Sequence, residues 1–200
     1  MKKIIAIFST VLLLGAVTGC DNYLDVNTDP NSVASVENGL ILPAVEANIM
    51  FTYGLYGHII GSYFSEQWAQ KCGGPQYITI AQFNTSNGNQ GASYANSMYN
   101  NIHRIVHNNA GTIMEQATAS ESWGDYLAAT VYRVFGYQML IDVLGETPYS
   151  EAQNTAITSP KYDEGKDVYA GIIGELDAAL AQVTGNELVC NNMLFHGDNS

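Results

Sequence analysis

Residues 122–144 read SWGDYLAATVYRVFGYQMLIDVL, and this stretch decides the fold class of the 200-residue chain. Its large apolar side chains recur at intervals of three and four residues, which is the spacing of one face of an α-helix. The two-residue alternation that a half-buried β-strand needs does not run through it. The stretch therefore predicts one long helix. The broad apolar face of that helix carries Trp123, Leu127, Val131, Val134, Phe135 and Met139.

The segments on either side show the same helical spacing. Residues 94–116 predict a helix that precedes the first one across a short link, so the two are expected to pack as antiparallel neighbours. The apolar side chains near helical spacing in it are Ala95, Met98, Tyr99, Ile102, Val106 and Ile113. Residues 166–183 predict a further helix, which Gly185 would end. Its apolar residues are Val168, Ile172, Leu176, Ala179, Leu180 and Val183. Residues 38–70 predict one or two more, with Pro43 in the early turns. No segment alternates convincingly as a strand, so the predicted class is all-α.

Residues 47–65 contain no Asp, Glu, Lys or Arg, so a membrane-spanning helix has to be considered there. Polar side chains interrupt this segment, and Gly54, Gly57 and Gly61 follow one another closely. We therefore expect a helix that is buried on most sides within a soluble helical array. Its glycines would allow neighbouring helices to approach closely.

The composition restricts the class of partner. Charged residues make up 13% of the chain, and 7 basic residues against 19 acidic ones give a net charge of −12. This balance makes nucleic-acid backbones and anionic lipid surfaces poor partners. The 13 Tyr, 6 Phe and 2 Trp are too many aromatic residues for a disordered acidic tail. A surface solvated by neutral polar groups suits sugars or neutral peptides.

The first twenty residues predict export and a lipid anchor. Two lysines precede an apolar stretch, residues 4–17, which is shorter than the ~20 residues that span a bilayer. The stretch ends in Val-Thr-Gly-Cys at residues 17–20, which resembles the bacterial lipoprotein box. We expect residues 1–19 to be a cleaved signal peptide and Cys20 to be the lipid attachment site, since several acyl chains anchor stably. The alternative is an ordinary secretory signal with an incidental cysteine.

Residues 20–36 are interpreted as a lipidated tether with turn chemistry. Oxygen-bearing side chains alternate between Asp25 and Asn31 as they do in a calcium loop. However, Pro30 stands where that loop needs Gly, and Val36 stands where it needs a bidentate Glu. Asx turns that lead into a helix explain the segment better.

Two cysteines remain beyond the tether, Cys72 and Cys190. An oxidising compartment permits a disulfide between them, but their spacing carries no information about pairing. We favour two separate buried thiols and leave the pairing open.

Motifs for catalysis or metal binding are absent or incomplete. His103 and His107 have the i, i+4 spacing of zinc-protease ligands, but Arg104 stands where that motif requires Glu. We therefore expect a pair of histidines at the surface or on a helix flank. Residues 91–95 only approach a nucleophile elbow, because the final Gly and the preceding strand are missing. The prediction is a protein that is not an enzyme and needs no metal or cofactor.

The loop at residues 71–91 is rich in Gly, Asn, Gln, Ser and Thr, with aromatic residues between them. Long loops are often functional, and a neutral sugar needs a flat apolar face to stack on and short donors for its hydroxyls. An equally good explanation is that the rings only attach the loop to the core. The candidate ligand-binding residues are Trp68, Tyr77, Phe83, Asn84, Asn87 and Tyr94.

Six short motifs follow one another in order along the chain. They are CDNYLDVNTDPN at residues 20–31, LPAV at 42–45, SEQWAQ at 65–70, DVLGETPYSEA at 142–152, SPKYD at 159–163 and LDAAL at 176–180. Together they resemble the SusD/RagB family of nutrient-binding outer-membrane lipoproteins, in particular its SusD-like branch. The fourth motif departs from the family's Gly-Asp-x-Pro-Tyr turn, because Glu146 replaces the usual Asp.

This resemblance implies an all-α fold of tetratricopeptide-like helix pairs with long irregular loops. It implies a lipid-anchored protein at the cell surface, in the outer membrane, that captures oligosaccharides or peptides without catalysis. The implied partner is a TonB-dependent, SusC-like transporter, to which the ligand is delivered. Family members generally run to more than twice this length, so residues 37–200 are expected to be the N-terminal helical part of a truncated SusD-like domain.

Two other functions stay open at this point. The first is a lipid-anchored helical scaffold that binds only a protein partner. The second is a glycoside hydrolase, which would release product from an oligosaccharide and lose that activity on substitution of a carboxylate.

Overall fold

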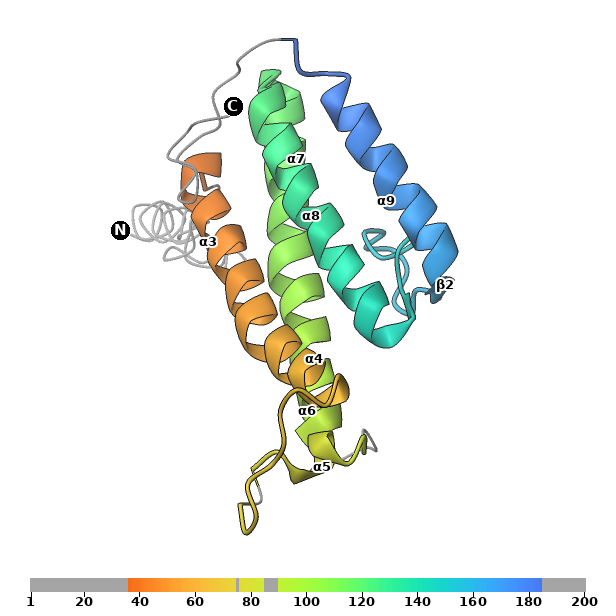
Figure 1. Cartoon of the computed structure of the whole chain (residues 1–200). Coiled ribbons are helices and arrows are strands. Elements are labelled where there is room, and N and C mark those ends of the chain that lie inside the picture. Colours follow the sequence, from red (N-terminus) through yellow and green to blue (C-terminus); the bar gives the residue numbers. More distant parts are fainter. Residues whose placement is uncertain (1–35, 75, 85–89, 185–200) are drawn as a thin grey trace, which may run out of the picture. The chain divides into compact units, whose positions relative to one another are not determined.

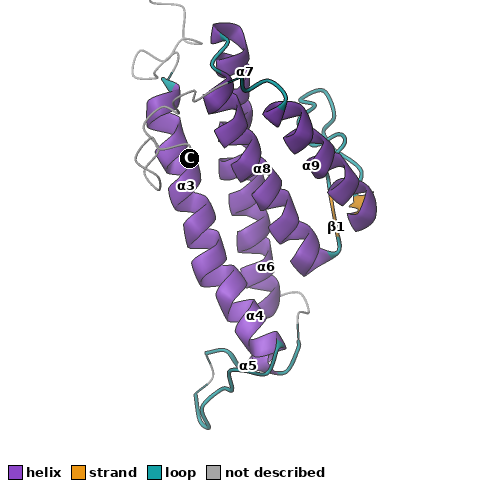
Figure 2. Cartoon of the chain, turned by 45° about the horizontal axis from the view of Figure 1, so that its top comes forward, coloured by secondary structure: helices purple, strands orange, loops and turns teal. Residues whose placement is uncertain are grey.

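The computed structural model describes residues 36–74, 76–84 and 90–184, and most of these residues are helical (Figures 1 and 2). The predicted all-α class is confirmed. The helices are α3 (Asn38–Phe51), η1 (Thr52–Gly57), α4 (His58–Phe64), α5 (Ile78–Ala81), α6 (Gln90–Asn101), η2 (Ile102–His107), α7 (Asn108–Ser120), α8 (Trp123–Leu144) and α9 (Gly165–Leu180). Two short antiparallel strands, β1 (Glu146–Thr147) and β2 (Asp163–Glu164), pair beside them.

Two of the helical segments are continuous rods with a π-helical turn in the middle. The backbone angles at Thr52 and His58 stay helical, so α3, η1 and α4 form one rod. Asn108 is likewise helical, so α6, η2 and α7 form a second rod. A π-turn inserts one extra residue per turn, shifts the faces of the helix beyond it, and often occurs at functional sites.

Helix α8 is the central element of the described part. It packs against α7 and α3 on one side and against α9 on the other, as Figure 1 shows. By length and composition alone, α8 is the one helix among the described residues that could cross a membrane. Because it lies between packed neighbours, we interpret it as a core helix.

The main core forms where the two rods meet α8. Its side chains include Leu42, Val45 and Ile49 from α3, and each of them is fully buried. Burying a side chain of this kind contributes about 1.5–3 kcal/mol. Of the residues with helical spacing in 94–116, the second rod buries Met98, Ile102, Val106 and Ile113 in this core. Ala95 and Tyr99 are only partly buried.

The apolar faces predicted for α8 and α9 are only partly correct. Met139 is buried, but Val131 is 44% exposed, and Leu180 of α9 is 52% exposed. Because α8 contacts neighbours on two sides, small residues such as Ala129 and Gly136 occupy its closest contacts. Helix α9 also ends at Leu180, before Gly185, which lies outside the described residues.

The first rod differs from the prediction that it is buried on most sides. It buries one face, while Phe51 and Tyr53 on the other face are 51% and 56% exposed. A Cβ atom placed on Gly54 or Gly61 would meet nothing within 4 Å. These two glycines therefore do not serve a close helix approach, and that expectation is wrong.

The predicted cysteine environments are tested in one case. Cys72 is a free thiol and is exposed, so the expectation of a buried thiol is wrong for this residue. Cys190 lies outside the described residues, as do Cys20, the predicted signal peptide and residues 20–35 of the tether.

Candidate functional site

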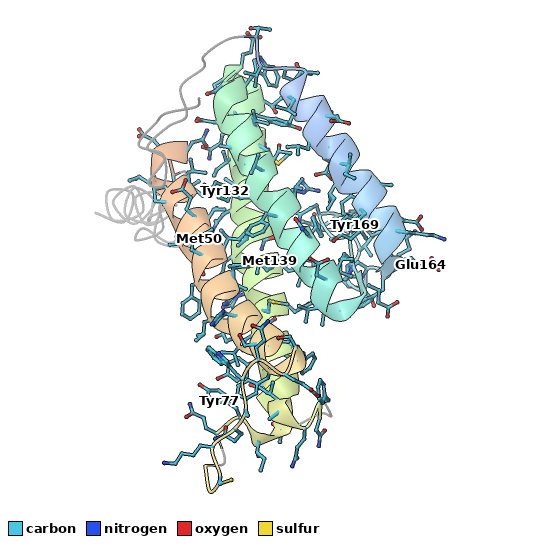
Figure 3. The ribbon with its side chains drawn as sticks, in the orientation of Figure 1. Met50, Tyr77, Tyr132, Met139, Glu164 and Tyr169 are labelled. Carbon is cyan, nitrogen blue, oxygen red and sulfur yellow. The ribbon has the colours of Figure 1, made fainter. Side chains whose placement is uncertain are left out.

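An aromatic cluster gathers where α4, α5 and the start of α6 meet. We define it as Tyr56, Tyr63, Trp68, Tyr77 and Tyr94. Ring centroids are 6.1 Å apart for Tyr63 and Trp68, 5.5 Å for Tyr63 and Tyr77, and 6.3 Å for Tyr77 and Tyr94. Tyr94 in turn lies 5.4 Å from Tyr56. These separations are typical of favourable aromatic pairs. Three of the sequence-predicted binding residues thus lie in one cluster; Figure 3 labels Tyr77 within it.

The members of this cluster differ in exposure. Tyr77 and Tyr94 are partly buried, and burial, followed by the neighbouring Tyr77 hydroxyl, raises the pKa of Tyr94. Together with the buried Ile80 they attach the loop to the core, as the alternative explanation proposed. Trp68, in contrast, is 45% exposed, so its ring is available to a ligand.

Phe83 forms a separate exposed pair beside the aromatic cluster. Its ring lies 5.3 Å from that of Phe64, and both rings are exposed. Asn84 is exposed, and its backbone N–H donates to the carbonyl oxygen of Thr79 at 2.8 Å. Asn87, the remaining candidate, lies outside the described residues.

The backbone around Trp68 and Phe83 is held in unusual conformations. The N–H groups of Gln67 and Trp68 both donate to the carbonyl oxygen of Ser62, at 3.0 Å each, which fixes the exit from α4. Glu66 and Phe83 have φ values of 57° and 54°. Residues other than glycine rarely adopt this left-handed region, which costs of order 1–2 kcal/mol per residue. The exposed rings are therefore presented by a defined backbone.

A cleft of about 380 Å³ opens between the first rod and the C-terminal part of α8. Its floor includes Met98 and Met139, both buried; Figure 3 labels Met139 on α8. Hydroxyl, amide and imidazole groups come from the α4 side, and Asp142 lies on the α8 side. None of the residues that line the cleft is Lys or Arg. The polar groups on the α4 side are His58, Ser62, Ser65 and Gln67.

The cleft and the aromatic cluster are connected through His58. The His58 ring lines the cleft, and its centroid lies 4.8 Å from that of Trp68 in an edge-to-face arrangement. The exposed Trp68 therefore stands beside the cleft. Sequence reasoning missed the cleft, because its walls come from segments about 80 residues apart whose local patterns do not report their contact. The signal that the sequence offered was the four-residue spacing of Gly57 and Gly61, which both line the cleft.

The predicted surface histidine pair is wrong, because His107 is fully buried. The carbonyl oxygen of Arg133 can only accept, so Nε2 of His107 donates to it at 3.2 Å. Nδ1 of His107 is then the acceptor for Nδ1–H of His103 at 3.4 Å. Nε2 of His103 in turn accepts from the Thr147 hydroxyl at 3.0 Å. These proton positions are those of two neutral rings.

Burial is the cause of this neutral state. It lowers the pKa of His103 to about 4, and it lowers the pKa of His107 well below its usual value, helped by the nearby His103 and Arg133. The ring nitrogens are occupied by protein groups. Among the described residues no three His, Cys, Asp or Glu side chains come together to hold a metal ion. The pair therefore links the second rod to Arg133 of α8 and to Thr147 of β1.

Two of the six sequence motifs fold against each other. The N–H groups of Tyr149 and Ser150 donate to the Asp163 carboxylate at 3.1 and 2.8 Å. Burial acts to raise the pKa of Asp163, but these hydrogen bonds outweigh it and the pKa is lowered. The Tyr149 hydroxyl donates to Glu175 of α9 at 2.8 Å. These motifs therefore fix α9 beside α8.

Comparison with known proteins gives one family. The model of the SusD-like_2 family, described as "Starch-binding associating with outer membrane", matches residues 30–200. No curated protein matches the chain.

Proposed function

Because that family model covers most of its length, the chain belongs to the SusD-like family, and from this membership we propose that it binds neutral oligosaccharides at the cell surface without cleaving them. The family description supports carbohydrate binding and an association with the outer membrane. The ligand class is drawn from the chain's own chemistry.

One observation carries this proposal: the exposed ring of Trp68 stands beside a cleft with neutral hydrogen-bonding groups. Trp68 offers a flat apolar face next to His58 of the cleft wall, and the α4 side of the cleft offers hydroxyl and amide groups. A sugar ring has the complementary surfaces, an apolar face and a rim of hydroxyls. The net charge of −12 adds repulsion against anionic ligands.

The two tryptophans of the chain allow a direct test. Trp68 stands beside the cleft, whereas Trp123 begins α8, about 28 Å along the helix from Asp142. In a Trp123→Phe variant the tryptophan fluorescence comes from Trp68 alone. A saturable change in emission on titration with neutral oligosaccharides is expected there, and no change is expected in a Trp68→Phe variant. A response from Trp123 alone would contradict the proposed site.

We also propose that Cys20 carries the lipid anchor and that residues 1–19 are removed. Cys20→Ala should abolish labelling by a radioactive fatty acid, because acylation needs this thiol. Cys72→Ala is the matched control and should label normally, although Cys72 is an exposed thiol. Labelling that persists in Cys20→Ala would show that the predicted anchor is wrong.

The proposed partner is a TonB-dependent, SusC-like transporter in the same membrane, which would receive the bound ligand. The antiparallel neighbours α7 and α8, and α8 and α9, fit the proposed tetratricopeptide-like pairing. The alternative is a lipid-anchored scaffold that binds only a protein partner. That scaffold would form a stable complex with the transporter and bind no oligosaccharide or peptide.

A further inference from the structure

We propose that the cleft between α4 and α8 holds one neutral sugar ring at the end of a bound glycan, with the adjoining part of the glycan over Trp68. This inference rests on the proposed function and assigns a ligand subsite to it. It predicts which glycans the cleft accepts and at which position a larger side chain would block it.

The size of the cleft favours a single ring. Its volume of about 380 Å³ lies at the small end of the ~300–1,000 Å³ that is typical of small-molecule sites. A long oligosaccharide segment does not fit, but one ring with its hydroxyl groups does. The rest of the glycan must then leave the cleft.

The lining matches both surfaces of a sugar ring. Met98 and Met139 form an apolar floor that is already dehydrated by burial. The exposed ring of Tyr53 forms part of the wall. Ser62 and Gln67 offer a hydroxyl and an amide, which can each donate and accept a hydrogen bond. A neutral ring with several hydroxyls satisfies these groups without a counter-ion.

Asp142 supplies a fixed acceptor on the opposite wall. The Tyr169 hydroxyl of α9 donates a short hydrogen bond to Oδ1 of Asp142, which holds the carboxylate in place. A carboxylate has about four acceptor positions, so Asp142 retains capacity for a sugar hydroxyl. Figure 3 labels Tyr169 on α9, the helix next to α8.

The same carboxylate makes the cleft selective by charge. No Lys or Arg lines the cleft, so a uronic acid or a sulfated sugar would place its anion near Asp142 without compensation. The two like charges would repel each other. Neutral rings avoid this repulsion.

The exit from the cleft leads past Trp68. His58 forms part of the wall, and its ring lies 4.8 Å from that of Trp68. Because Trp68 is 45% exposed, the next ring of a bound glycan can stack there. The site therefore combines a subsite for one terminal ring with an open platform.

Gly61 lines the cleft and provides the test. A Cβ atom on Gly61 would meet nothing within 4 Å, so a larger side chain there enters open space rather than the core. Gly54 lies on the same rod and is equally open, but it does not line the cleft. Gly61→Leu should fill the subsite, and Gly54→Leu is its matched control.

The experiment uses calorimetry on the full chain with neutral oligosaccharides of glucose, galactose, mannose and xylose. For the ligand that binds, Gly61→Leu should weaken the affinity at least tenfold, whereas Gly54→Leu should change it less than twofold. Equal affinities for the two variants would overturn the subsite and leave the proposed function intact. Absence of binding to all of these glycans by the unsubstituted chain would overturn both.

A second variant tests the subsite without adding bulk. Asp142→Asn should weaken binding of the neutral ligand several-fold and should reduce the discrimination against an oligogalacturonate relative to a neutral galactan of the same length. If the unsubstituted chain binds the oligogalacturonate as tightly as the galactan, the proposed charge selectivity is wrong.

Discussion

At the scale of single residues, the pair of the part-buried His103 and the buried His107 makes the stability of the fold depend on pH. His103 and His107 stay neutral in the folded chain because burial lowers the pKa of both. In the unfolded chain an ordinary histidine binds a proton below a pH of about 6.5. The unfolded state therefore binds more protons, and the free energy of unfolding falls as the pH drops below 6.5.

For His103 the size of this effect follows from its pKa. The shift from 6.5 to about 4 corresponds to a loss of about 3 kcal/mol as the pH falls through this window. Urea unfolding at pH 7, 6 and 5 measures the loss, with His103→Gln as the comparison. The variant should lose less stability than the unsubstituted chain between pH 7 and 5. Parallel losses would contradict the neutral pair, because carboxylates titrate equally in both proteins.

The candidate site was predictable from sequence only in part. Trp68, Tyr77 and Tyr94 could be chosen because aromatic rings in a polar loop suggest a binding surface, and the structure brings them together around Tyr63. Asp142 could not, because its role depends on the approach of α8 to the first rod. The burial of His107 could not be predicted for a similar reason, because it depends on the packing of α8 against the second rod. Gly136 provides the room, since a Cβ there would lie 2.8 Å from Nε2 of His107.

At the scale of elements, the helical spacing predicted the existence of each long helix better than its buried face. In the second rod the face was correct, because that rod buries one continuous stripe against α3 and α8. In α8 the face was partly wrong, because contacts on two sides place Thr130 inside and Val131 outside. The end of α9 at Leu180 was missed, because the stop signal was placed at Gly185, five residues beyond the last helical residue.

Two glycines of α9 give opposite predictions. A Cβ on Gly171 would collide with the ring of Tyr149, which is held by its hydrogen bond to Glu175. Gly171→Ala should therefore destabilise the fold by about 1–3 kcal/mol. Gly174 has open space around it, so Gly174→Ala should stabilise the helix by about 0.5–1 kcal/mol. Thermal unfolding of both variants measures the difference; shifts in the same direction would show that α9 is not seated on Tyr149.

The first rod is tested by substitutions on its two faces. Ile49 is fully buried, so Ile49→Ala should cost about 2–5 kcal/mol. Phe51 is 51% exposed, so Phe51→Ala should cost less than about 1 kcal/mol. Urea unfolding of the two variants compares the faces directly. A similar loss for Phe51→Ala would mean that this exposed face is packed in solution.

At the scale of the whole molecule, the charge content and the fold both agree with binding of an uncharged ligand. Helices joined by polar loops present aromatic rings and neutral polar groups, and the low charge content of the sequence predicts the same uncharged class of ligand as the lining of the cleft. The family to which the chain belongs is described as starch-binding and as associating with the outer membrane. The central claim that joins these scales is that the chain binds neutral glycans and does not cleave them.

Isothermal titration calorimetry of the full chain against neutral oligosaccharides tests that claim most directly, with peptides of similar size as the comparison and recovery of the sugar afterwards. The account predicts saturable heat with at least one neutral oligosaccharide, which is recovered uncut. No heat with any neutral oligosaccharide would contradict it, and release of shorter products would contradict its non-catalytic part.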